Sequence, residues 1–169
     1  MSPVLVLIGP PGAGKSTIAH AVGERLGLAV RDTDDDIVAS TGMPVAQIFV
    51  DHGEPYFRRL EEAAVAEALS EHDGVLSLGG GAPMSSSTRK LLAQHRVVFL
   101  DVSLPAATKR VGLSASRPLL LGNVRGRLKV LLDERRPLYA EAATHVVVTD
   151  DLDIDTVTDR VVDLLGADR

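Results

Sequence analysis

The sequence contains no cysteine and no tryptophan, and aromatic residues make up only 3% of it. Without cysteine the chain cannot form a disulfide, a zinc–thiolate site or a catalytic thiol. The shortage of aromatic rings removes the platforms on which bases of single-stranded nucleic acid stack. A formal net charge of −5 argues against binding to duplex nucleic acid or to an anionic membrane surface. We therefore expect no nucleic-acid partner and no membrane partner.

Long apolar runs are also missing. No stretch approaches the roughly 20 apolar residues that span a bilayer. The first residues lack the basic segment, apolar stretch and small-residue cleavage site of a signal peptide. A chain of 169 residues with 45% hydrophobic and 24% charged residues is typical of one globular domain with a substantial core. We expect a single cytoplasmic domain over residues 1–169, most simply a monomer.

A phosphate-binding motif lies near the N-terminus. The segment Gly9-Pro-Pro-Gly-Ala-Gly-Lys15-Ser16 has the form G-x-x-x-x-G-K-[ST], and it separates an apolar run from a helical pattern. Glycine lets backbone N–H groups approach phosphate oxygens, and the following helix directs its N-terminus at the same anion. Lys15 is suited to reach the β- and γ-phosphates, and the Ser16 hydroxyl to hold Mg²⁺. The motif predicts a nucleoside triphosphate site.

Apolar runs alternate with helical patterns along the whole chain. We expect strands at residues 4–8, 28–31, 74–78, 97–101 and 145–148. This alternation predicts an α/β fold with a parallel sheet covered by helices on both faces. Ligands of such folds bind beyond the carboxyl ends of the strands. Three strands end in residues suited to chemistry, and we expect these ends to meet in one crevice: 9–16, 32–34 and 79–81.

Aspartates follow the second strand. In an extended backbone the side chains of Asp32 and Asp34 share a face about 7 Å apart, and Thr33 points away. Asp32 could then contact Mg²⁺ through water, and Asp34 could orient an acceptor hydroxyl or take its proton. We expect Asp35 and Asp36 to cap the following helix and interact with its dipole instead.

Three consecutive glycines, residues 79–81, directly follow an apolar strand. This composition is costly in backbone entropy. It is either a flexible loop or, as we expect, a place where a ligand approaches the backbone closely. The segment 112–122 carries Arg117 between two glycines. It is either a surface loop or a lid whose arginine stabilises the transferred phosphoryl group and excludes water.

Two arginine pairs on helical segments allow two interpretations. Arg58-Arg59 could form weak ion pairs on a solvated helix face, and Arg135-Arg136 could be surface residues that suit a helix C-terminus. Arginine is also the residue that grips a small carboxylate through two parallel hydrogen bonds. Beside a kinase site, the second interpretation predicts an acidic acceptor.

Together these motifs resemble those of shikimate kinases over nearly the whole chain. The shared segments are 9–17, 32–34, 57–61, 78–82, 117–120 and 136–139. Many kinases share the first segment, whereas all six in this order and spacing are specific. The resemblance implies that the γ-phosphoryl of ATP is moved to the 3-hydroxyl of shikimate with Mg²⁺. It also implies a P-loop kinase fold of three layers, with a five-stranded parallel sheet ordered 2-3-1-4-5.

The resemblance further implies roles for individual residues. The catalytic residues would be Lys15, Asp34 and Arg117. ATP would be bound by Gly12, Ala13, Gly14, Lys15, Ser16, Thr17, Arg110 and Arg117, with Arg110 packing on adenine. Mg²⁺ would be held by Ser16 and Asp32. Shikimate would be bound by Asp34, Arg58, Gly80, Gly81 and Arg136, with Glu61 holding Arg58 in place.

Two larger segments complete this picture. A shikimate-binding region would span about 33–61 and a lid about 112–124. The loop at 149–155 departs from the pattern of many members, because it is acidic and lacks their arginine and proline beside the adenine. The alternatives are a gluconate or nucleoside monophosphate kinase of the same fold, and a nucleotide-binding switch without acceptor. The paired arginines favour a small polyhydroxy acid over a base, and the absence of an Asn-Lys-x-Asp motif counts against a GTPase.

Overall fold

The computed structural model describes residues 2–112 and 123–167. Arg117 and most of the expected lid, 112–124, lie outside the described residues. The strands are β1 (Leu5–Ile8), β2 (Val30–Asp32), β3 (Val75–Ser77), β4 (Val97–Asp101) and β5 (His145–Val148). The helices are α1 (Lys15–Leu26), α2 (Thr33–Thr41), α3 (Val45–His52), α4 (Glu54–Glu71), α5 (Ser86–Leu92), α6 (Leu104–Gly112), α7 (Val124–Ala142) and α8 (Ile154–Ala167), with a 3₁₀ turn η1 (Ala82–Met84).

The five strands form one parallel sheet in the order β2-β3-β1-β4-β5. This order confirms the prediction. In the central strand β1, Leu5 and Leu7 pack into one hydrophobic cluster, and Val6 and Ile8 pack into another. Because successive side chains of a strand point to opposite faces, a strand covered on both faces reads as a continuous apolar run.

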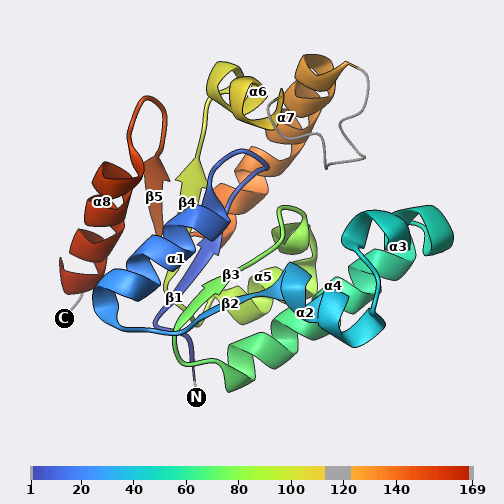
Figure 1. Ribbon diagram of the computed structural model, residues 1–169, viewed down its shortest axis with the longest axis horizontal. Helices are drawn as coiled ribbons and strands as arrows, with labels where there is room; N and C mark the ends of the chain where they lie inside the picture. Colours follow the sequence, from blue (N-terminus) through green and yellow to red (C-terminus); the bar gives the residue numbers. More distant parts are fainter. Residues whose placement is uncertain (1, 113–122, 168–169) are drawn as a thin grey trace.

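Helices cover both faces of the sheet (Figure 1). On one face, α1 and α8 pack against β1 and β4 through a cluster that includes Ile18 and Val161. On the other face, α4 and α5 contribute Val65 and Leu92 to the second cluster. The long helix α7 contributes to both clusters. The result is the expected three-layer arrangement.

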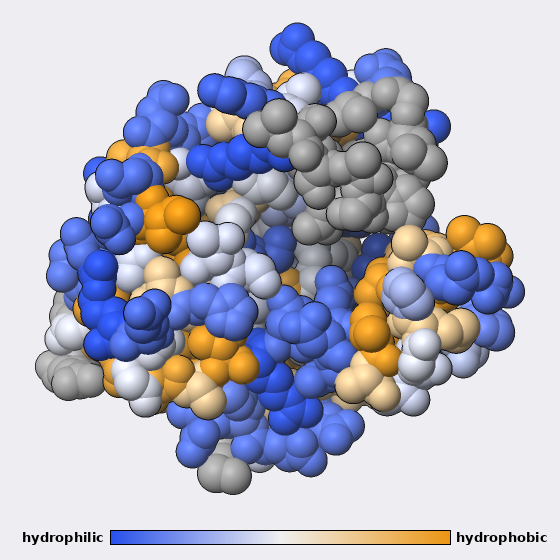
Figure 2. Space-filling view, viewed as in Figure 1, coloured by the Kyte–Doolittle hydropathy of each residue, from blue (hydrophilic) through white to orange (hydrophobic). Residues whose placement is uncertain are grey.

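A third, smaller hydrophobic cluster lies beside the sheet. It joins α2, α3 and the start of α4 through Ile37, Ile48 and Phe57. Figure 1 shows α3 projecting away from the sheet, and Figure 2 shows apolar surface on that side of an otherwise mostly hydrophilic face. Within the described ranges, no helix has both the length and the apolar character needed to cross a membrane.

Candidate active site

The phosphate loop connects β1 to α1. Gly12 and Gly14 adopt φ values of 83° and 84°, a left-handed conformation that residues with a Cβ adopt only at a cost. Gly14 is the N-cap residue of α1, so the helix N-terminus faces the loop, as an anion site requires. The Lys15 ammonium donates to the carbonyl oxygens of Gly9, at 2.7 Å, and Pro10, at 3.1 Å. The lysine side chain therefore lies across the loop whose bound phosphates it is expected to contact.

Oxygen atoms suited to Mg²⁺ lie beside this loop. The Ser16 hydroxyl oxygen is 3.5 Å from Asp32 Oδ2. Both residues line a cavity of about 300 Å³ together with Lys15 and Asp34. Burial raises the pKa of Asp32, and the hydrogen bond from the Asp34 N–H acts against this rise. A hydroxyl and a carboxylate fit Mg²⁺, which prefers oxygen ligands and takes only one or two from the protein when it binds with phosphates.

The backbone at Asp32–Asp34 differs from the prediction. α2 begins at Thr33, because the Asp32 carboxylate accepts a hydrogen bond from the Asp34 N–H at 2.8 Å and caps the helix. The chain is thus extended at Asp32 but helical at Asp34. The capping role expected of Asp35 and Asp36 belongs to Asp32, and Asp36 pairs with Arg31 at 2.7 Å.

Residues 79–81 form a wall shared by the two halves of the site. A Cβ at Gly79 would lie 2.7 Å from Asp34 Oδ1 and 2.9 Å from Glu61 Oε2. A Cβ at Gly80 would lie 3.5 Å from both the Gly9 carbonyl oxygen and Arg135 Nη1, and one at Gly81 would overlap the Arg58 guanidinium. Gly79 and Gly81 therefore leave room for charged side chains of the site against the backbone, whereas a Cβ at Gly80 would be in ordinary contact.

Arg58 is held from several sides. Its Nη1 donates to Glu61 Oε1 at 2.8 Å, and its Nε and Nη2 donate to Glu54 Oε1 at 3.3 and 3.2 Å. Its guanidinium also lies over the rings of Phe57 and Phe49, at 5.4 and 5.9 Å from their centroids. Burial acts to lower the pKa of Arg58, but the two glutamates outweigh it and the pKa is raised. The contact with Glu61 agrees with the expected positioning role.

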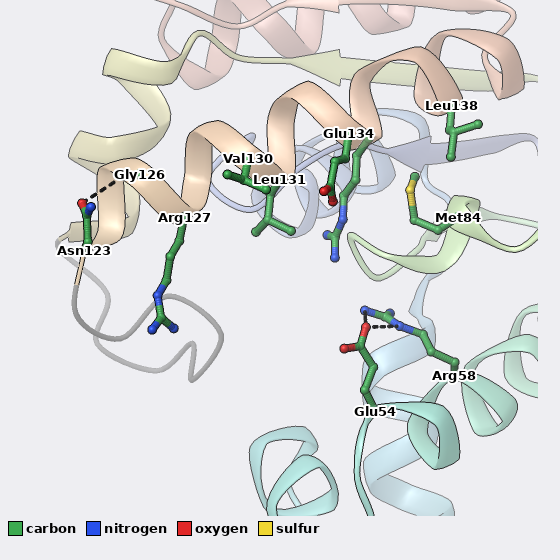
Figure 3. A pocket seen from close by; sticks show the side chains of 11 residues that line it. Glu54, Arg58, Met84, Asn123, Gly126, Arg127, Val130, Leu131, Glu134 and Leu138 are labelled. Atoms are coloured by element: carbon green, nitrogen blue, oxygen red, sulfur yellow. Dashed lines mark hydrogen bonds and ion pairs between the residues drawn. The ribbon is translucent and has the colours of Figure 1, made fainter.

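A groove of about 980 Å³ lies between α4 and α7. Figure 3 shows Arg58 and Glu54 on one wall, and Arg127, Val130, Leu131 and Glu134 of α7 on the other. Arg135 also lines this groove and is 9% exposed.

Arg136 is not among the residues that line this groove, although the resemblance implies that it binds the acceptor carboxylate with Arg58. Its Nε is 3.3 Å from Asp101 Oδ1, and its Nη2 donates to the Val102 carbonyl at 3.1 Å. These contacts direct the Arg136 side chain toward the end of β4. The arginine of the pair that lines the groove is Arg135, which was not among the residues expected to bind the acceptor.

The sequence alone does not separate Arg135 from Arg136. The inward face of α7 carries Leu128, Leu132 and Tyr139, all buried. Arg135 follows Leu132 by three residues and precedes Tyr139 by four, and Arg136 follows Leu132 by four and precedes Tyr139 by three, so both have the spacing of that face. The Tyr139 hydroxyl donates to the Gly80 carbonyl at 2.6 Å. Helical periodicity therefore leaves both arginines as candidates, and the packing of α7 in the structure places Arg135 in the groove.

A third cavity, of about 420 Å³, adjoins the phosphate loop on the side of α8. Arg110 lines it and donates to the carbonyl oxygens of Gly12, at 2.8 Å, and Thr149, at 3.1 Å. Leu152 and Ile154 supply apolar lining from the acidic loop. The cavity thus combines the Arg110 guanidinium with apolar side chains and with the polar side chains of Thr17, Thr149 and Asp153.

Comparison with known proteins agrees with this site. A family model described as shikimate kinase matches residues 11–166. The chain belongs to the shikimate kinase family. It is 56% identical to the shikimate kinase of Saccharopolyspora erythraea over 170 residues, which cover 100% of this chain and 97% of that protein. It is 52% identical to that of Salinispora arenicola over 167 residues, covering 99% of this chain and 100% of that protein.

Solved structures of shikimate kinases share the fold. The enzyme of Acinetobacter baumannii, solved in complex with shikimate, has a TM-score of 0.94 and 32% identity, covering 100% of this chain and 95% of that one. The enzyme of Aquifex aeolicus has a TM-score of 0.84 and 27% identity, covering 97% of this chain and 96% of that one. The predicted P-loop kinase fold is confirmed.

Proposed function

We propose that this chain transfers the γ-phosphoryl group of ATP to the 3-hydroxyl of shikimate, giving shikimate 3-phosphate and ADP. One observation supports this reaction most strongly: residues 79–81 separate a phosphate loop from a groove that carries Arg58 and Arg135. Two guanidinium groups in one groove suit a small carboxylic acid. The proposal places this step in the biosynthesis of aromatic amino acids.

The acceptor carboxylate would be bound by Arg58 and Arg135. Glu61, which is 4% exposed on its side chain, keeps Arg58 in place. Burial raises the pKa of Glu61, and the positive charges of Arg58 and Arg135 oppose that rise. Gly80 and Gly81 would line the ring of the acceptor, because Arg135 and Arg58 lie directly against them.

Asp34 would act on the attacking hydroxyl. It lines the phosphate cavity and lies against Gly79, so it stands where the two halves of the site meet. The acceptor oxygen forms a bond to the γ-phosphorus, and the bond from that phosphorus to the oxygen bridging to the β-phosphate breaks. The hydroxyl proton passes to the Asp34 carboxylate, and ADP leaves.

The phosphate loop would hold the donor. Residues 12–17 offer backbone N–H groups to the phosphates, and Lys15 exchanges its loop carbonyls for β- and γ-phosphate oxygens. Mg²⁺, held by Ser16 and Asp32, would neutralise charge on those oxygens when bound with ATP. Adenine would occupy the cavity beside Arg110, and Arg117 would act from a lid at about 112–124. The acceptor-binding region would span about 33–61 of a single domain.

An ADP-release assay tests the reaction. Purified protein with ATP, Mg²⁺ and shikimate should release ADP well above a control without shikimate. Gluconate and nucleoside monophosphates, the acceptors of the alternative kinases, should leave the rate at the control level. Equal rates with and without shikimate would refute the proposal. We also propose that the enzyme is a cytoplasmic monomer, for which gel filtration should give one peak near 17.9 kDa.

A further inference from the structure

We propose that the Glu54 carboxylate occupies the edge of the Arg58 guanidinium that binds the acceptor. It moves away from this edge when an acidic acceptor binds. Glu54 would thereby set the affinity of the site for the acceptor's carboxylate. This inference rests on the proposed function, since it needs an acidic acceptor at Arg58.

The first argument is the division of Arg58's donors between two glutamates. The Nη1 end points to Glu61, and the edge with Nε and Nη2 points to Glu54. That edge is one that can bind a carboxylate through two parallel hydrogen bonds. Glu54 lines the groove together with Arg58 (Figure 3). An acceptor carboxylate arriving in the groove therefore meets a position that already holds a carboxylate.

The second argument is the difference between the two glutamates. The Glu61 side chain is 4% exposed, whereas that of Glu54 is 53% exposed. Moving Glu61 away would leave a buried charge without its partner, which is strongly unfavourable. Moving Glu54 returns a carboxylate to water. Glu54 is also the first residue of α4, where the helix N-terminus favours a negative charge in either position.

The third argument is the quality of the contact. A single oxygen of Glu54 accepts from both Nε and Nη2, at 3.3 and 3.2 Å. Charge-assisted N–H···O hydrogen bonds are about 2.7–2.9 Å long, and arginine–carboxylate pairs are frequently bidentate. A ligand carboxylate that uses both oxygens can make the better pair, so exchange is favourable when the acceptor is present.

Arg58 keeps its position during this exchange. Glu61 still binds Nη1, and the rings of Phe57 and Phe49 still lie under the guanidinium. The arginine is therefore ordered before and after the acceptor binds. Glu54 differs from Glu61 in function: Glu61 positions Arg58, and Glu54 competes for it.

The test is the variant Glu54→Gln, with the dissociation constant of shikimate measured by calorimetry and its KM by ADP release. Exposed ion pairs contribute about 0.2–1 kcal/mol, so both constants should fall by up to about fivefold while kcat stays unchanged. The methyl ester of shikimate has no carboxylate, and its dissociation constant should be equal for the wild type and the variant. This pair of ligands separates exchange at Arg58 from any general change in the groove.

Asp133→Asn is the matched control. Asp133 forms an i,i+4 ion pair with Lys129 at 2.7 Å, with side chains 59% and 64% exposed, and it is not among the residues that line the groove. The control removes the same charge and should leave the shikimate constants unchanged. Unchanged or weaker binding of shikimate to Glu54→Gln would overturn the inference, as would an equal gain for the ester or for Asp133→Asn. A wild type that releases no ADP with shikimate would instead overturn the proposed function.

Discussion

Replacing each arginine of the Arg135-Arg136 pair by glutamine should separate their roles. Arg135 is 9% exposed and lies beside Gly80 in the groove proposed to bind the acceptor. Removing one partner of a buried, hydrogen-bonded charge pair costs about 2–5 kcal/mol. A loss of about 2 kcal/mol corresponds to roughly a thirtyfold weaker interaction. We therefore expect Arg135→Gln to raise the KM for shikimate at least about thirtyfold.

Arg136→Gln is the control in the same helix turn. The Arg136 side chain is 41% exposed and pairs with Asp101 at the end of β4. A partly exposed ion pair of this kind contributes about 0–1 kcal/mol to stability. The KM for shikimate should stay within about twofold of the wild type, and the KM for ATP should not change in either variant.

The assay is ADP release at saturating ATP with shikimate varied, together with a thermal unfolding curve of each variant. Arg135→Lys adds a finer test, because lysine keeps the charge but loses the planar pair of donors. It should bind shikimate better than Arg135→Gln and less well than the wild type. A larger rise in KM for Arg136→Gln than for Arg135→Gln, with both proteins folded, would refute the assignment.

Three further predictions follow from the same site. Asp34→Asn should lower kcat by about 10²-fold or more with nucleotide affinity nearly intact, and turnover close to the wild type would remove Asp34 from the chemistry. Gly81→Ala should raise the KM for shikimate but not for ATP. Its φ of −91° accommodates alanine, whereas the new methyl group overlaps the Arg58 guanidinium; equal effects on both substrates would contradict this. Burial raises the pKa of Asp32, so the folded protein binds this proton more tightly than the unfolded chain. The difference in free energy of unfolding between the wild type and Asp32→Asn should decrease as the pH rises. The decrease should begin near the unfolded pKa of about 3.9 and end above the raised pKa of the folded protein, after which the difference should stay level. Urea titrations across this range check the sign, and a relative stability that increases with pH would exclude the cause given.

The sequence predicts the architecture well because the deciding signals are local. The apolar run of β1, the glycines of the phosphate loop and the alternation of strands with helices each depend on neighbouring residues. The position of residues 79–81 at the end of β3 was predictable for the same reason. Their close contact with Asp34, Glu61 and Arg58 was not, because it depends on residues far away in the sequence.

The partners of individual side chains were harder to predict. They depend on the direction in which each side chain leaves its helix or strand, and a sequence motif does not give that direction. Arg135 and Arg136 differ by one position, and only the packing of Tyr139 decides which one faces the groove. At Asp32, a side-chain hydrogen bond starts α2 one residue after the strand, which overrides the extended geometry expected of Asp34. Glu54 and Arg58 form an i,i+4 pair on α4. Such pairs occur on many helices without any function, so the spacing alone did not predict that Glu54 competes for Arg58.

The third hydrophobic cluster is separate from the two clusters that pack against the sheet. Helix α4 is rooted in the core of the sheet by Val65, Ala68 and Leu69, while Phe57 at its other end packs with Ile37 and Ile48. Phe57 lies under the Arg58 guanidinium, and Ile37 belongs to α2, which begins beside Asp32 and Asp34. One small set of packed side chains therefore joins the segment that carries Arg58 to the segment that carries the two aspartates.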